Sequence, residues 1–297
     1  MPSLQEILGE DHFVQKYSYQ KDIRFLQLPD QKVVIKPKKR YDLETVYRYL
    51  QDHHVTSYVS PLAIEKNEVL FPHCEDALLT ADEKAKKMLY TLSIWQNKTT
   101  THQRLDIDEV KARYELYRKK IADTNLYYHN LQDMIETKVY MSPSEYLLVR
   151  NSSLIYAALA YSQQALEEWY QRIQQKKSKR QVYCHGKCEL SHFLGSDNGY
   201  FISVENAHLG DVWEDFACFY RQDFQQVDMI SSFHFYQHKY PFTKEEQLAL
   251  YVELSLPEII DIYPSSLQKC QQLTKFIEYL LRTSEFLSEQ QKKNQEH

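Results

Sequence analysis

Side chains that can bind a metal ion or attack a substrate gather in residues 182–220. Four that can bind zinc fall within nine residues: Cys184, His185, Cys188 and His192. Thiolate and imidazole groups are the usual ligands of structural zinc, so this spacing admits a zinc-stabilised structural protein. Adjacent ligands fit one tetrahedral centre poorly, and buried cysteines commonly only pack, so plain structural cysteines are the competing interpretation.

A cysteine nucleophile is the second chemistry that this stretch suggests. Cys184 or Cys188 would need His185 as its base and a third group to orient the imidazole. Cys184 and His185 are neighbours on an expected strand, where consecutive side chains point to opposite faces. The sequence offers no third group, so nucleophilic catalysis is not predicted.

Glycine is scarce, and its distribution limits the kinds of phosphate site that are possible. The chain has five glycines, of which three lie close together: Gly186, Gly195 and Gly199. A Walker A loop or a dinucleotide fingerprint needs several glycines at one strand–helix turn, so this distribution excludes both motifs.

Composition restricts the function further. The chain of 297 residues carries a formal net charge of −5 and has no apolar run of about 18 residues, so neither nucleic acid nor a membrane span is expected. One basic run is interpreted as the solvated end of a helix rather than a polyanion site: Arg172, Lys176, Lys177, Lys179 and Arg180. The start lacks a secretory signal and the five cysteines lack a framework spacing, which predicts a reduced, cytoplasmic protein.

The elements that must position residues 182–220 follow from hydrophobic periodicity and turn signals. Strands are predicted at 12–19, 23–28, 32–36 and 67–72, with one helix at 41–53. Together they indicate a small antiparallel sheet with a helix packed on it.

From Thr80 onward the pattern is helical. Helix starts are predicted at four capping boxes or close relatives, which begin at Thr80, Asp106, Ser142 and Thr243. Long apolar stripes predict helices over 106–139 and 143–174, and helices resume after residue 210. Between these regions, "QVYC" and "GYFISV" predict two strands around a "GSDNG" turn, in a hairpin at 181–204.

The stretch that begins at His185 resembles the active-site motifs of the aminoglycoside phosphotransferase and choline kinase superfamily, including its spore-coat-protein branch. The family pattern H-G-D-x-x-x-x-N-[IVL]-[IL] corresponds here to "HGKCELSHFL". The pattern I-D-[FW]-[DE]-x-A-x-x-G-D-P-x-x-D-L-A corresponds to "ISVENAHLGDVWEDFA", which begins at Ile202. The spacing is preserved throughout, and this similarity covers residues 182–220.

The resemblance implies an active site in which three residues differ from the family pattern. The family Asp after His-Gly acts on the acceptor hydroxyl, and the later Asn and Asp hold Mg²⁺ against the nucleotide phosphates. Lys187, His192 and Ser203 occupy these positions, so the formal charge changes from −2 to +1 with His neutral. An ammonium is no base, and Mg²⁺ prefers hard oxygen ligands, so this site would repel the cation. Glu205 is the remaining acid nearby, and we expect it to pair with Lys187.

The scaffold residues of the motif are retained. By resemblance, His185 and Gly186 shape the loop, Gly210 forms a turn, and Asp215 anchors the loop from the following helix.

In the first 72 residues, Lys36 stands where a strand lysine would anchor phosphate, with Glu44 or Glu65 as its partner. The competing interpretation is a solvated lysine at a strand end, because Pro37 follows it and the first β-turn has no glycine to close over phosphates.

We therefore expect an α+β, bilobal protein-kinase-like fold. A small β-rich N-lobe would span 1–72, and a large, mainly helical C-lobe would span 73–297. The predicted function is a catalytically degenerate small-molecule-kinase-like protein, or pseudokinase, that binds or scaffolds a protein or small-molecule ligand in the interlobe cleft. Bacterial cytoplasm, in a spore-coat-like setting, is its expected location.

Neither ATP nor Mg²⁺ is expected as a cofactor, and no metal site is predicted. Two alternatives stay open. One is an active phosphotransferase on a small hydroxyl or amino compound, in which Glu205 or a carboxylate not yet located is the residual acid, and the other is the zinc-stabilised structural protein.

Overall fold

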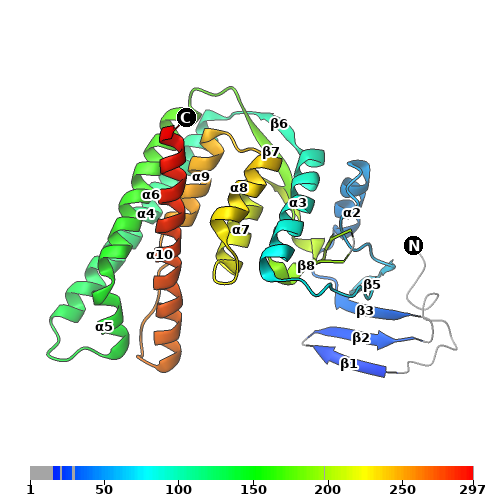
Figure 1. Cartoon of the computed structure of the whole chain (residues 1–297), viewed down its shortest axis with the longest axis horizontal. Coiled ribbons are helices and arrows are strands. Elements are labelled where there is room, and N and C mark those ends of the chain that lie inside the picture. Colours follow the sequence, from blue (N-terminus) through cyan, green and yellow to red (C-terminus); the bar gives the residue numbers. More distant parts are fainter. Residues whose placement is uncertain (1–15, 21, 29–30, 197, 297) are drawn as a thin grey trace. The chain divides into compact units, whose positions relative to one another are not determined.

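The computed structural model describes residues 16–20, 22–28, 31–196 and 198–296, which form two compact units (Figure 1). The first unit contains the described residues up to Thr100 together with Val182–Gly210, and the second contains Thr101–Gln181 and the described residues from Asp211 onward. The expected mixed α+β class, with a small sheet region and a large helical part, is confirmed. The units differ from the expected division at residue 72, because helix α3 (Ala81–Thr99) and residues 182–210 group with the sheet.

A five-stranded antiparallel sheet forms part of the first unit. Its strands are β1 (Lys16–Gln20), β2 (Ile23–Gln27), β3 (Lys32–Pro37), β4 (Ala63–Ile64) and β5 (Glu68–Pro72), in the order β1-β2-β3-β5-β4. The expected strands are therefore confirmed, except that residues 12–15 of the first lie outside the described residues.

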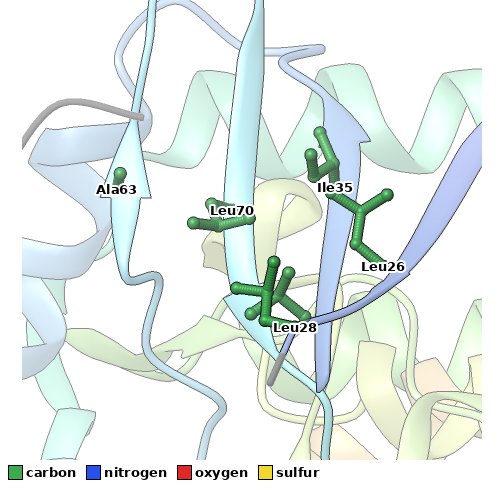
Figure 2. Packing of buried hydrophobic residues seen from close by; sticks show 6 residues of the cluster. Leu26, Leu28, Ile35, Ala63 and Leu70 are labelled. Carbon is green, nitrogen blue, oxygen red and sulfur yellow. The ribbon is translucent and has the colours of Figure 1, made fainter. Parts of the chain in front are cut away.

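The packed face of the sheet carries aliphatic residues in register. Ile35 pairs with Leu70, which in turn pairs with Ala63. Leu26, Leu28 and Val33 belong to the same buried cluster, part of which is labelled in Figure 2. Strand side chains alternate between faces, so Lys36 projects from the face of β3 opposite to Ile35. The apolar register thereby fixes the direction of this lysine.

Two helices accompany the sheet in the first unit. Helix α2 (Leu43–Asp52) buries Leu43, Val46, Tyr47 and Leu50 and packs against the short 3-10 helix η2 (Val204–Asn206). Helix α3 begins at the Thr80–Glu83 capping box and packs against a second 3-10 helix, η1 (Leu190–His192). Both helices therefore contact the stretch that carries the motif.

The predicted hairpin at 181–204 is present in a shorter form. Strand β8 (Phe193–Leu194) pairs with β9 (Tyr200–Phe201) across the "GSDNG" turn, where Gly199 has a φ of +66°. The "QVYC" segment is not the partner of "GYFISV", which corrects the prediction. It belongs to β7 (Ser178–Cys184), whose last residues pair with β10 (His208–Gly210).

Helices make up most of the second unit: α4 (Ile107–Glu136), α5 (Pro143–Arg150), α6 (Ser152–Ile173), α7 (Glu214–Asp223), α8 (Met229–Lys239), α9 (Lys244–Ser255) and α10 (Leu267–Glu296). Helix α6 packs against α4, α9 and α10 (Figure 1). Strand β6 (Thr101–Arg104) pairs with the first residues of β7. Among the described helices, none combines the length and apolar character needed to cross a membrane.

The four predicted helix starts are confirmed. Capping boxes form at Thr80, Ser142 and Thr243, and the Asp106 carboxylate accepts hydrogen bonds from the first backbone amides of α4. The helix expected over 143–174 is broken, because Asn151 ends α5 and its side chain donates a hydrogen bond back to the Leu147 carbonyl. Backbone bonding by asparagine competes with helix continuation.

Candidate functional site

The loop after β7 is held by one buried histidine and one glycine. His185 is fully buried, and its Nε2 donates a 2.9 Å hydrogen bond to the Ile202 carbonyl. Burial lowers the pKa of this imidazole to about 4, so the ring is neutral at pH 7. Gly186 has a φ of +75°, and a Cβ added there would lie 2.3 Å from the Asn206 carbonyl oxygen. The loop thus lies directly against residues 202–206.

Lys36 and Ser203 meet although they are far apart in sequence. The Lys36 ammonium donates a 3.2 Å hydrogen bond to the Ser203 hydroxyl and lies 5.5 Å from the centre of the Phe71 ring. Burial lowers the pKa of Lys36, as does the nearby charge of Lys187, while Glu205 acts in the opposite direction. Lys36 is partly buried rather than solvated, so the interpretation as a surface lysine is wrong.

Of the two partners predicted for Lys36, Glu44 is engaged elsewhere. Glu44 forms an ion pair of 2.8 Å with Lys38, and Glu65 lies in the turn between β4 and β5. Arg40, which sequence reasoning missed, binds Asp42 and donates a 2.5 Å hydrogen bond to the Ala207 carbonyl. Residues 36–42 therefore contact residues 203–207 at two points.

His192 also borders the lysines. Its Nδ1 lies 2.5 Å from a Glu189 carboxylate oxygen, which also accepts a 2.7 Å hydrogen bond from the Ser191 hydroxyl. Burial lowers the pKa of His192, and the positive charges of Lys187 and Lys36 lower it further, while Glu189 opposes them. The structure thus brings the three substituted positions and Lys36 into one cluster.

Glu205 lies beside this cluster without the expected partner. It is partly buried and its charge acts on Lys36 and Tyr47, but within the described part of the chain it forms no ion pair with Lys187. The Tyr47 hydroxyl is buried and, among the described residues, makes no hydrogen bond. Burial and Glu205 both raise the pKa of Tyr47. Tyr47 stands at an apolar position of α2, so the sequence pattern did not indicate that its hydroxyl lies near Glu205.

The backbone at Ser203 is left-handed, with φ +64° and ψ +41°. A non-glycine residue in this region costs about 1–3 kcal/mol and tends to occur at functional sites. This turn lies within the "GYFISV" segment predicted as a strand, of which Tyr200–Phe201 alone form β9, and its Ser203 hydroxyl accepts the hydrogen bond from Lys36.

Side chains in this cluster do not fit a magnesium ion. Mg²⁺ requires near-octahedral oxygen ligands, usually including one or two carboxylates. The substituted positions contribute an ammonium, an imidazole and a neutral hydroxyl, while the Glu189 carboxylate is engaged by His192. Among the described residues of the cluster, Glu205 is the one carboxylate that is not held by a basic side chain in an ion pair.

The zinc set does not assemble either. Cys184 and Cys188 are fully buried, His185 binds the Ile202 carbonyl, and His192 faces Glu189. Among the described residues, these four side chains do not place their ligand atoms around one point.

The two remaining scaffold residues lie at the ends of elements. Gly210 ends β10, where it pairs with Val182. Asp215 is buried in the first turn of α7, in the second unit. Sequence reasoning missed Arg113, which forms an ion pair with Asp211 in the same unit.

Comparisons with known proteins place the fold. No protein-family model and no curated protein matches the chain. Among solved structures, an aminoglycoside phosphotransferase from Alicyclobacillus acidocaldarius is 12% identical at a TM-score of 0.74, over 96% of this chain and 93% of that chain. An AMP-bound spectinomycin phosphotransferase is 15% identical at a TM-score of 0.58, over 94% of this chain and 97% of that chain.

The complex of spectinomycin phosphotransferase with ADP and spectinomycin also matches, with 14% identity and a TM-score of 0.52, over 95% of this chain and 97% of that chain. At such low identities the similarity establishes the fold alone. The chain has the kinase-like α+β fold of the aminoglycoside phosphotransferases.

Proposed function

We propose that this chain is a catalytically degenerate protein with a small-molecule-kinase fold, which binds a ligand instead of transferring phosphate. The observation that carries the proposal is the hydrogen bond between Lys36 and Ser203. By resemblance, a phosphate-anchoring lysine and a metal-binding carboxylate would occupy these two positions. Here the lysine bonds a neutral hydroxyl, which cannot neutralise a divalent cation.

Electrostatics support the loss of catalysis. Phosphoryl transfer depends on positioning and on neutralisation of the phosphate charge, and Mg²⁺ supplies the largest part of that neutralisation. Lys36 and Lys187 both carry positive charge beside the former metal position, so a second cation would be repelled.

An anionic group is the ligand chemistry that this cluster favours. Lys36 and Lys187 offer ammonium donors, and Tyr47 offers a hydroxyl that is buried without a partner among the described residues. A phosphate or carboxylate would satisfy these donors without a metal ion. We therefore propose metal-independent binding of an anion at this site.

One observation favours the runner-up, an active phosphotransferase. The Glu205 carboxylate forms no ion pair with Lys187 in the described chain, so its oxygens are available to a metal ion or an acceptor. A single carboxylate rarely holds Mg²⁺ alone, which makes this the second candidate.

Turnover assays with a repaired variant test the proposal. With Mg²⁺-ATP and a panel of small amines and alcohols, the wild-type chain should release and transfer no phosphate above the protein-free rate. The triple variant Lys187→Asp, His192→Asn and Ser203→Asp restores the family residues and should gain Mg²⁺-dependent ATP binding. Lys119→Asp, on an exposed position of α4, is the control and should gain nothing. Wild-type turnover that Glu205→Gln abolishes would establish the runner-up instead.

A further inference from the structure

A cavity of about 410 Å³ lies within the second unit. It is lined by the first turns of α4, the end of α6, the start of β7, residues 211–213 and the first turns of α9. All of the lining residues belong to the second unit, whereas the Lys36–Ser203 cluster belongs to the first. The volume falls within the range of small-molecule sites, which begins at about 300 Å³.

Two tryptophans form part of the apolar wall. Trp169 comes from α6 and Trp213 precedes α7, and Val110 and Ile173 lie among the other apolar lining residues. Indole rings offer flat apolar surface and attract cations to their faces. This wall suits the hydrocarbon or aromatic body of a ligand.

Carboxylates outnumber cations around the cavity. The lining contains five of the former and three of the latter: Asp106, Glu109, Asp211, Glu245 and Glu246, against Arg113, Lys179 and Arg180. Two of these pairs are tight. Arg113 forms an ion pair with Asp211, and Arg180 donates two hydrogen bonds, of 2.9 and 2.5 Å, to the Glu246 carboxylate. Glu245 is paired with Lys176 at 3.3 Å, from outside the lining.

The surplus negative charge lies at the start of α4. Glu109 is 61% exposed and only loosely paired, at 3.8 Å from Lys179. Asp106 caps the helix, and no described cation pairs with its carboxylate. An anion would meet these two acids, while Arg113 and Arg180 are already held in tight ion pairs and Lys179 has its loose contact with Glu109. The interpretation of this basic run as a polyanion site therefore gains no support.

We propose that this cavity binds a small organic cation, a protonated amine or guanidine on an apolar or aromatic body. Its nitrogen would lie at Asp106 and Glu109 in charge-assisted hydrogen bonds, and its body would lie against Trp169 and Trp213. The proposal is independent of the anion site in the first unit.

Three probes with one ring and different charges test the charge requirement. Phenethylamine, 2-phenylethanol and phenylacetate would each be titrated against the full chain, with tryptophan fluorescence and melting temperature as readouts. Two of the three tryptophans line the cavity, and the third, Trp95, is fully buried in the first unit. Only phenethylamine, which carries the positive charge, should quench the tryptophan fluorescence saturably and raise the melting temperature of the chain. Equal responses to all three probes, a preference for phenylacetate or no response to any of them would overturn the proposal.

Two carboxylate variants on one helix test the site itself. Glu109→Gln should weaken phenethylamine binding about tenfold, because it removes one charge-assisted hydrogen bond. Glu115→Gln, an exposed change on α4 outside the lining, should leave the affinity unchanged. Unchanged binding in Glu109→Gln, or an equal loss in both variants, contradicts the assignment. Trp213→Phe should reduce the quench amplitude, and an unreduced amplitude places the probe elsewhere.

Discussion

Lys36 Nζ lies 3.2 Å from Ser203 Oγ, although 167 residues separate the two in sequence. The bond joins the end of β3 to a left-handed turn between β9 and η2. Lys36 also lies near the charges of Lys187 and His192. The hydrogen bond therefore joins Lys36 to Ser203, one of the three positions at which the sequence differs from the family pattern.

The first prediction concerns this hydrogen bond. Ser203→Ala removes the acceptor from a partly buried ammonium and should lower the free energy of unfolding by about 1 kcal/mol. Alanine has the same left-handed strain as serine, so backbone strain does not enter the comparison. Ser191→Ala, which removes an exposed hydrogen bond to Glu189, is the control and should cost less. Equal denaturant midpoints for the wild type and Ser203→Ala would show that the bond contributes nothing.

The second prediction concerns the glycine of the loop. Gly186→Ala should destabilise by about 2 kcal/mol or more, because it adds left-handed strain and a clash with the Asn206 carbonyl. In Gly195→Ala the new Cβ meets the end of the Leu79 side chain at 2.7 Å, which can move away. Chemical denaturation should therefore show a larger decrease in the free energy of unfolding for Gly186→Ala than for Gly195→Ala. The reverse order would mean that the loop does not need this backbone.

The third prediction is a pH dependence. Burial lowers the pKa of His185 to about 4 from an unfolded value of 6.5. The unfolded chain therefore takes up the proton first, so this contribution to stability is complete above pH 6.5 and is lost as pH falls toward 4. Between these two pKa values, the free energy of unfolding should change with pH by up to about 1.4 kcal/mol per pH unit.

A difference measurement isolates this histidine from other titrating groups. His185→Gln keeps a donor for the Ile202 carbonyl but does not titrate. Between pH 7 and 4, the free energy of unfolding should fall more steeply for the wild type than for the variant. Parallel curves would mean that His185 is accessible to protons in the folded chain.

The fourth prediction concerns Asp215, which is 1% exposed in the first turn of α7. Asp215→Ala should lower the free energy of unfolding by about 1–3 kcal/mol, because a carboxylate buried this deeply requires polar partners and the substitution leaves those partners unsatisfied. Asp123→Ala, on an exposed position of α4, should have a small effect. A melting temperature that does not change in Asp215→Ala would count against the anchoring role implied by the family resemblance.

Local chemistry made much of the fold predictable from the sequence. A capping box is complete within four residues, so the helix start at Thr80 could be recognised without tertiary information. Periodicity likewise indicated the strand that ends near Lys36. The break at Asn151 was missed, because the apolar stripe continues across it and only the asparagine side chain marks the interruption.

Non-local relationships were less predictable. Strand β7 pairs with β6 and β10 rather than with the "GYFISV" segment, and strand pairing of this kind depends on contacts that local patterns do not encode. Spacing identified Lys187 and His192, but the bond between Lys36 and Ser203 joins distant segments. Tyr47 looked like an ordinary core residue on α2, since its hydroxyl leaves the apolar spacing unchanged.

Whether Mg²⁺ contributes to nucleotide binding is the most direct test of the central claim, that the site no longer holds a metal–phosphate complex. The measurement is the melting temperature with ATP, in the presence of excess Mg²⁺ and in its absence with a chelator. A ligand present at 100 times its Kd stabilises the folded chain by about 2.7 kcal/mol, and a shift in the melting temperature detects a change of this size. The account predicts that any shift with ATP alone is not increased by Mg²⁺, because Lys187, His192 and Ser203 offer the ion no carboxylate. A larger shift with Mg²⁺ that Glu205→Gln removes would contradict it.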